Sequence, residues 1–111
     1  MAEEEFLQLL KNVRDFDWNP NKREQVFRDR GIDFDDARHV LSGPHIVRRS
    51  DRRGEARYMV FGFLGDLEVV FVCTFRGELC WVITARRASR DERKKYHSHL
   101  PRPFTPAQVQ E

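Results

Sequence analysis

The sequence predicts an α+β domain in which N-terminal helices precede an antiparallel sheet and a last helix follows it. Three observations support this fold class. Residues 1–43 carry helical spacing and helix-capping residues, residues 45–85 are rich in β-branched and aromatic residues separated by short glycine-containing breaks, and residues 89–96 open with a capping box. With 111 residues, 40% hydrophobic and 34% charged, the chain fits one domain around one modest core.

A short amphipathic helix is expected over residues 3–14, because apolar side chains recur there at helical spacing, at Phe6, Leu9, Leu10 and Val13. We expect residues 1–14 to form a helical extension of the domain. The chain starts with an acidic run where a secretory signal would be basic, and no apolar run approaches the roughly 20 residues that span a bilayer. We therefore expect a cytoplasmic protein without membrane contacts.

Two further helices are indicated by the residues at their ends. Asn19 is a typical N-cap residue, Pro20 suits the first helical position, and Gly31 is expected to end this helix in a left-handed conformation. Asp33 is expected to cap the next helix, which Gly43 ends together with the proline that follows it.

Residues 45–85 predict an antiparallel meander of about four strands, because the connections are too short for parallel crossovers. In the last two strands we expect the odd-numbered side chains to face the helices and the even-numbered face to be more open, although three valines on that face limit the inference. The expected strands are His45–Arg49, Arg57–Phe63, Leu67–Phe75 and Leu79–Ala85.

The last helix is the strongest local prediction. Ser89 and Glu92 have the spacing of a capping box, and the helix is expected to continue to about Tyr96. The main domain is therefore placed at residues 15–96. Residues 97–111 contain three prolines and few core-type residues, so they are expected to form a flexible tail.

Cys73 and Cys80 are the only cysteines, and they lie in adjacent apolar runs whose register can bring them together or place them on opposite faces. We expect buried, reduced thiols. Neither belongs to a C-x-x-C pair or lies near suitably spaced histidines, so we expect no metal site and no cofactor.

Positive charge is concentrated in two stretches, although the formal net charge is only +2. One stretch, residues 48–57, has five arginines and two carboxylates, and the other, residues 86–95, has six basic residues and two carboxylates. Such segregation suits a polyanion such as RNA, whereas a solvated charged surface is the simpler interpretation. The expected RNA-binding residues are Arg52, Arg53, Arg87, Arg90, Arg93 and Lys94.

Several short motifs occur in an order typical of one protein family. They are Phe16-Asp17-Trp18-Asn19-Pro20 with Lys22, Gly31-Ile32-Asp33-Phe34-Asp35-Asp36-Ala37, Glu55 with Arg57-Tyr58, Gly62, and Ile83-Thr84-Ala85-Arg86-Arg87-Ala88-Ser89 with Glu92 and Tyr96. This set resembles the BrnT toxins. The resemblance implies a RelE-like fold, a ribonuclease that halts translation, and neutralisation by a ribbon-helix-helix antitoxin that also represses the operon. A BrnA-like antitoxin in a heterotetrameric complex is the expected partner.

Two positions depart from the family pattern. This chain has Val26 where relatives usually have asparagine, and Arg30 where they usually have histidine. Arginine stays protonated, so Arg30 suits phosphate binding but not proton abstraction. These departures keep open an alternative function, a non-catalytic module that binds RNA or a protein through the same basic surface.

Metal-independent cleavage of RNA needs groups that orient the 2′-hydroxyl and stabilise negative charge in the transition state. Because a guanidinium can hold two phosphate oxygens at once, Arg57 and Arg86 are the preferred catalytic residues. Lys22 and Arg30 on the first capped helix are expected to add charge, and Tyr96 to stack on a base or donate a proton.

Each candidate also has a structural interpretation. Arg86 can pair with Glu68 or Glu92, and a similar ion pair is open to Arg57. The two basic residues of the first capped helix can simply be solvated, and Tyr96 can be a core contact. Glu92 can act as a base, although its place in the capping box already accounts for it.

Overall fold

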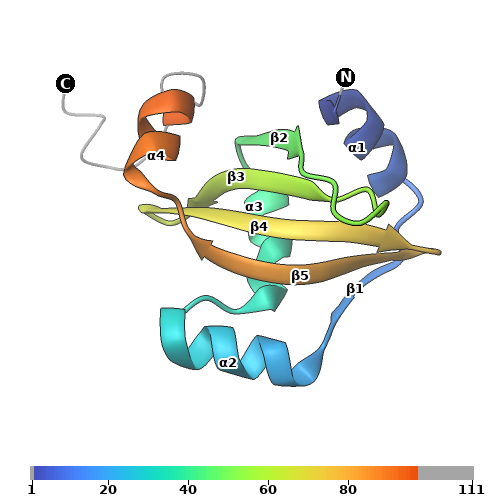
Figure 1. Cartoon of the computed structure of the whole chain (residues 1–111), viewed down its shortest axis with the longest axis horizontal. Helices are drawn as coiled ribbons and strands as arrows, with labels where there is room; N and C mark the ends of the chain where they lie inside the picture. The colour runs from blue at the N-terminus through green and yellow to red at the C-terminus, as the bar shows by residue number, and fades with distance from the viewer. Residues whose placement is uncertain (1, 98–111) are drawn as a thin grey trace.

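A computed structural model describes residues 2–97, which form a five-stranded sheet with helices packed against it (Figure 1). The elements are α1 (Ala2–Leu10), β1 (Asp15–Trp18), α2 (Pro20–Arg30), the 3-10 turn η1 (Phe34–Asp36), α3 (Ala37–Ser42), β2 (His45–Arg49), β3 (Tyr58–Leu64), β4 (Leu67–Arg76), β5 (Leu79–Arg87) and α4 (Arg90–His97). No helix in this part of the chain is long and apolar enough to cross a membrane. The expected tail lies outside the described residues, apart from its first residue.

The predicted meander is confirmed, but the sheet has five strands rather than about four. Strands β2 to β5 pair antiparallel in succession, and the strand order is β1-β5-β4-β3-β2. The additional strand, β1, pairs in parallel with β5, with Asp15 opposite Leu79 and Trp18 opposite Val82. A four-residue strand whose partner lies more than sixty residues away leaves little local pattern, so the sequence did not predict it.

Local capping signals decide where the helices begin and end. The Asn19 side chain accepts hydrogen bonds from the backbone N–H groups of Asn21 and Lys22, and Gly31 follows α2 with φ +71°, as predicted. Asp33 is a cap, but of the short turn η1, so α3 begins only at Ala37.

The N-terminal helix is shorter than the predicted span 3–14. It ends at Leu10, after which Asn12 and Val13 donate i→i−3 hydrogen bonds that tighten the chain. Phe6 is fully buried and joins the core, and the Tyr58 hydroxyl donates a 2.5 Å hydrogen bond to Glu5. The pKa of Tyr58 is raised to about 12, first by burial and then by this bond.

One face of the sheet packs against α1, α2 and α3, and we call it the helix-covered face (Figure 1). The helices contribute Phe6, Val26 and Val40, all less than 3% exposed. The strands contribute Tyr58, Val60, Val69, Phe71, Cys73, Cys80 and Val82. Both cysteines are therefore free thiols on the same buried face, which agrees with the expected state.

The prediction that odd-numbered side chains face the helices holds for β4 but is wrong for the first part of β5; it holds again at Ala85, after the bulge. The β4–β5 hairpin pairs Cys73 with Val82 and Phe75 with Cys80, so odd residues of β4 lie opposite even residues of β5. A bulge after Val72 then shifts the register by one residue. Trp81, before the bulge, therefore lies on the opposite face from the helices.

That opposite face, which we call the open face, is covered by α4 at one end only. Tyr96 of α4 is 8% exposed and packs against Phe61, with 5.3 Å between ring centroids. Val70 and Ala88 belong to the same small cluster. Figure 1 shows α4 beside one end of the sheet, so α4 leaves the rest of this face uncovered.

Gly62 is required where α3 crosses β3. A Cβ atom at this position would lie 2.6 Å from Val40 Cγ1 and 3.3 Å from the Pro44 carbonyl oxygen. We expect Gly62→Ala to lower the free energy of unfolding by about 1–3 kcal/mol, because α3 has to shift. The matched control is Gly43→Ala, whose added Cβ meets nothing closer than 3.9 Å. Equal denaturant midpoints for the two variants would contradict this prediction.

The capping box at the start of α4 is present. The Glu92 backbone N–H donates to Ser89 Oγ at 3.1 Å, and the Ser89 backbone N–H donates to Glu92 Oε1 at 2.8 Å. Ser89→Ala is expected to destabilise the protein by about 1 kcal/mol through loss of the first of these bonds. Urea denaturation with an unchanged midpoint and an unchanged m-value would refute this expectation.

Candidate functional site

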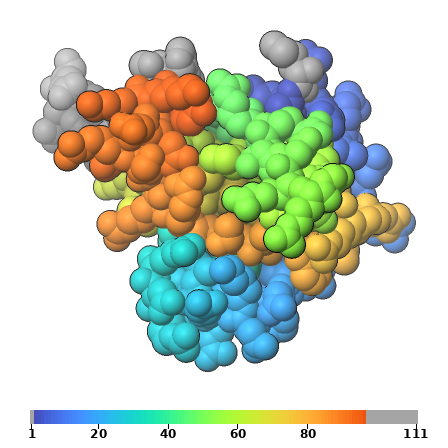
Figure 2. Space-filling model, in the orientation of Figure 1, coloured from blue at the N-terminus to red at the C-terminus, as the bar shows by residue number. Residues whose placement is uncertain are grey.

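The candidate site is the part of the open face that lies between α4 and the β2–β3 connection. Figure 2 shows this face, with α4 in orange, the connection in bright green and α2 below in blue. The strands present partly exposed side chains there, namely Arg57, Met59, Val72, Trp81 and Thr84. An apolar strip bordered by cations suits a ligand that has both flat apolar groups and negative charge.

One end of the site is a cluster built around Glu55. Its carboxylate accepts from Arg57 Nε at 2.9 Å and lies 3.7 Å from Arg76 Nη2. The Arg76 guanidinium in turn lies over the Trp81 ring, 4.5 Å from the ring centroid. The family-like motif Glu55-x-Arg57 therefore forms a carboxylate–guanidinium pair on the sheet surface, and Arg57 has the ion pair that was its structural alternative.

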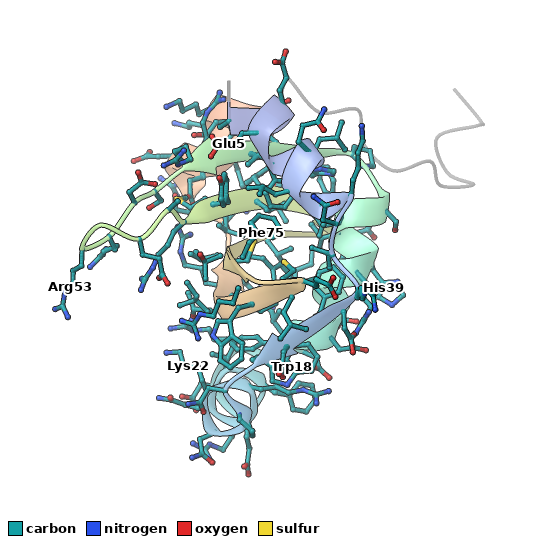
Figure 3. All side chains as sticks on the ribbon, turned by 90° about the vertical axis from the view of Figure 1, so that its right-hand side faces the viewer. Glu5, Trp18, Lys22, His39, Arg53 and Phe75 are labelled. Carbon is teal, nitrogen blue, oxygen red and sulfur yellow. The ribbon has the colours of Figure 1, made fainter. Side chains whose placement is uncertain are left out.

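The β2–β3 connection carries two further cations away from the sheet. Arg52 and Glu55 form an isolated bridge around a turn in which Arg53 has φ 51° and Gly54 has φ 80°. Thr74 Oγ1 donates to the Ala56 carbonyl at 2.8 Å and holds the base of this loop against β4. Figure 3 shows Arg53 projecting from the body of the protein. Arg52 and Arg53 have no ion-pair partner among residues 2–97.

Arg86 lies at the other end of the site and is paired with Glu92. Its guanidinium donates to both carboxylate oxygens, at 2.6 and 2.8 Å. This pairing, with the contacts from Ser89, lowers the pKa of Glu92 to about 2. Glu92 therefore stays ionised and is a poor proton acceptor. Of the two partners considered for Arg86, the structure shows Glu92.

Arg30 is close to the same end of the sheet. β1 ends opposite Val82, so the outer edge of β5 is open beyond that point, and Arg30 Nη1 donates to the Ala85 carbonyl at 2.8 Å. Its second contact, with Thr84 Oγ1, is longer at 3.4 Å. The side chain thus satisfies a strand-edge carbonyl and brings a positive charge beside the open face.

The remaining candidates are spread around the site. Lys22 has no ion-pair partner within the described residues, and Figure 3 shows it on the same side as Arg53, opposite His39. Tyr96 is a core contact, and Arg48 lies over its ring at 5.4 Å. On and before α4, Arg93 is 3.9 Å from Glu68, whereas Arg87, Arg90 and Lys94 have no ion-pair partner in the described part of the chain.

The two preferred arginines share the open face but do not converge on one point. Arg57 immediately precedes β3. Arg86 of β5 lies opposite Val70 of β4, which in turn lies opposite Phe61 of β3. Two strands and four residues along the strand therefore separate them, or about 16 Å from standard sheet spacings. A bound nucleic acid strand would meet them at different phosphates.

Arg76 and Trp81 were not among the residues predicted for the site. The two-residue connection between Arg76 and Leu79 does fix the hairpin register, which places Trp81 opposite Thr74 on the open face. That signal is present in the sequence. It conflicts with the simple alternation of bulky residues, which suggested that Trp81 is buried under the helices.

Comparison with known families and proteins identifies the chain. The sequence model of the family described as ribonuclease toxin, BrnT, of type II toxin-antitoxin system matches residues 18–92, which run from the end of β1 into α4. A comparison with curated proteins found no match. Because the matched region covers most of the chain and contains the whole antiparallel meander, the protein belongs to the BrnT family of ribonuclease toxins of type II toxin–antitoxin systems.

Proposed function

We propose that this protein is a metal-independent endoribonuclease that binds single-stranded RNA across the open face and inhibits translation in the cytoplasm. The observation that carries the proposal is the arrangement of arginines on both sides of an uncovered apolar strip, in a chain of a ribonuclease family. Arg57 and Arg76 lie at one end, and Arg30 and Arg86 lie at the other.

The chemistry proposed for this site uses the RNA 2′-hydroxyl as nucleophile. Its oxygen attacks the adjacent phosphorus, the bond to the 5′ oxygen breaks, and a 2′,3′-cyclic phosphate and a 5′-hydroxyl form. Glu55 is the proposed acceptor of the 2′-hydroxyl proton, and water returns a proton to the leaving oxygen. Arg57, 2.9 Å from that carboxylate, stabilises charge on the phosphorane-like transition state.

The other candidates have supporting roles in this proposal. Arg86 binds a second phosphate while Glu92 fixes its orientation, and Arg30 adds charge beside it. Lys22 extends the positive surface along α2. Tyr96 supports α4 from the small cluster on the open face and contacts RNA only at its exposed edge.

The proposed partner is a ribbon-helix-helix antitoxin of the BrnA type, which would bind in a heterotetrameric complex and repress the operon. Its support is membership of a type II toxin–antitoxin family, in which the antitoxin is a protein. The basic loop tip and the basic surface of α4 offer an acidic antitoxin segment the same charges that they offer RNA. Neutralisation by occlusion of the site follows from that overlap.

Arg86→Ala is expected to abolish growth arrest and to slow RNA cleavage by about 100-fold or more, because the guanidinium that holds a neighbouring phosphate and so positions the strand for reaction is lost. Binding of the antitoxin and the fold should remain largely intact. Arg86→Lys should rescue activity only partly, since an ammonium cannot hold two phosphate oxygens. Growth with and without the antitoxin, cleavage of RNA by purified variants and thermal melting are the measurements.

The matched control is Glu92→Gln, which breaks the same ion pair but keeps the arginine and a residue compatible with the capping box. Its amide oxygen can still accept one hydrogen bond from the guanidinium, so cleavage should fall far less than in Arg86→Ala, at a similar cost in stability. If both variants lose cleavage in proportion to stability, Arg86 has a structural role. If folded Arg86→Ala cleaves normally, Arg86 is not part of the site.

Binding of RNA should weaken steeply as salt rises, because each neutralised phosphate releases counterions. Removing Arg52 and Arg53 together should lower the slope of log affinity against log salt by about 1.4, or about 0.7 for each phosphate contact to a single strand. Arg38→Ala, on α3 behind the sheet, is the control and should leave the slope unchanged (Figure 1). A flat salt dependence of the unmodified protein would show that these charges are merely solvated.

A further inference from the structure

We propose that Trp81 is the platform on which one unpaired base of the RNA stacks, and that Arg76 moves from the ring to a neighbouring phosphate when the base arrives. The inference rests on the proposed function and names a binding residue for it. It makes Trp81 a determinant of how the strand is positioned on the open face.

The position of Trp81 suits such a contact. It is partly exposed near the start of β5, opposite Thr74 of β4, and Arg57, which precedes β3, lies in the same row on the far side of β4. None of the described helices packs over this part of the open face, because the α4 cluster lies at the other end, around Phe61. An indole on a flat, rigid sheet offers a large stacking surface without loss of side-chain freedom.

Arg76 is held loosely enough to leave the ring. Its side chain is 51% exposed, and its one ion pair in the described structure, with Glu55, is 3.7 Å long. The cation–π contact of Arg76 with the Trp81 ring, at 4.5 Å, is exposed to solvent. Such a contact is weaker than the stacking of a nucleobase on an aromatic ring. A phosphate next to the stacked base would then give the freed guanidinium a charged partner.

The charges around Trp81 determine on which side of the ring the RNA backbone lies. Asp17 of β1 lies opposite Trp81 on its outer side, while Arg57 and Arg76 lie toward β3 and β4. A phosphate is repelled on the first side and attracted on the second. The base therefore covers the ring, and the backbone runs along the side of the two arginines.

Trp18 provides a matched comparison within the same chain, because it too has an arginine over its ring. It is partly buried, packs against the helix-covered core and makes an edge contact with Phe34. Its arginine, Arg23, lies 4.8 Å from the ring centroid but donates to both oxygens of Asp33, at 2.7 and 3.0 Å. Two hydrogen bonds hold that arginine over the ring, so a base has to displace a more firmly held partner there than at Trp81.

The test is tryptophan fluorescence with a single-stranded RNA oligomer whose 2′-hydroxyls are methylated, which prevents cleavage by removing the nucleophile. Trp18→Phe leaves Trp81 as the emitter, and Trp81→Phe leaves Trp18. We expect saturable quenching in the first variant and none in the second. A duplex of the same sequence should not quench, since its bases are already stacked. Anisotropy of a labelled oligomer reports binding independently in every case.

A kinetic measurement on unmodified RNA completes the test. Trp81→Leu should raise KM about tenfold and leave kcat within about twofold, because it removes ground-state binding that the transition state shares. Its melting temperature must match that of the unmodified protein. The variant Arg76→Ala should raise KM less and leave the quenching intact.

The outcomes separate the two proposals. If RNA binds and is cleaved but Trp81 is not quenched, or if Trp18 is quenched equally, the stacking platform is overturned and the ribonuclease function stands. If the unmodified protein neither binds nor cleaves RNA, both are overturned. If Trp81→Leu lowers kcat at unchanged KM, Trp81 acts in the chemical step and the positioning role is overturned.

Discussion

The register of the β4–β5 hairpin is the constraint on which the rest of the structure depends. Its two-residue connection sets Phe75 opposite Cys80, and the bulge after Val72 then moves the pairing by one residue. The pairing set by the connection directs Cys80 into the core and Trp81 to the open face. The pairing beyond the bulge places Arg86 opposite Val70. Without that shift, the side-chain period of two would turn Arg86 toward the helices. A single irregularity therefore places both ends of the site on one surface.

The Arg86–Glu92 pair joins that surface to the last helix. Glu92 receives the guanidinium on both oxygens and also the Ser89 N–H, so one carboxylate caps α4 and orients a cation of the site. Its side chain is 17% exposed, which makes the contact stronger than an ordinary surface pair. The stabilisation is present above the usual carboxylate range, and it is lost as the pH falls toward the folded pKa of about 2. The Glu92 carboxylate thus both caps α4 and holds the Arg86 guanidinium in position.

What the sequence predicted correctly is local, and what it missed is not. Asn19, Gly31 and Ser89 act on backbone groups within a few residues, so their spacing alone identified the helix ends. The strand β1 and the facing of β5 depend on partners elsewhere in the sheet, and alternation within one strand cannot reveal them. The same distinction holds for the site. The motifs located Arg57 and Arg86 in the chain, but only the register shows which neighbours accompany them.

The two departures from the family pattern differ in consequence once they are placed in the fold. Val26 is 2% exposed in the core, so the change there concerns packing and not substrate contact. Arg30 reaches the Ala85 carbonyl at the point where β1 no longer covers the edge of β5, beside the open face. The described histidine side chains, His39 on α3 and His45 facing β3 at Gly62, lie away from that face. The candidate site within residues 2–97 therefore combines permanent cations with carboxylates, which is why we propose a carboxylate, Glu55, rather than an imidazole as the proton acceptor.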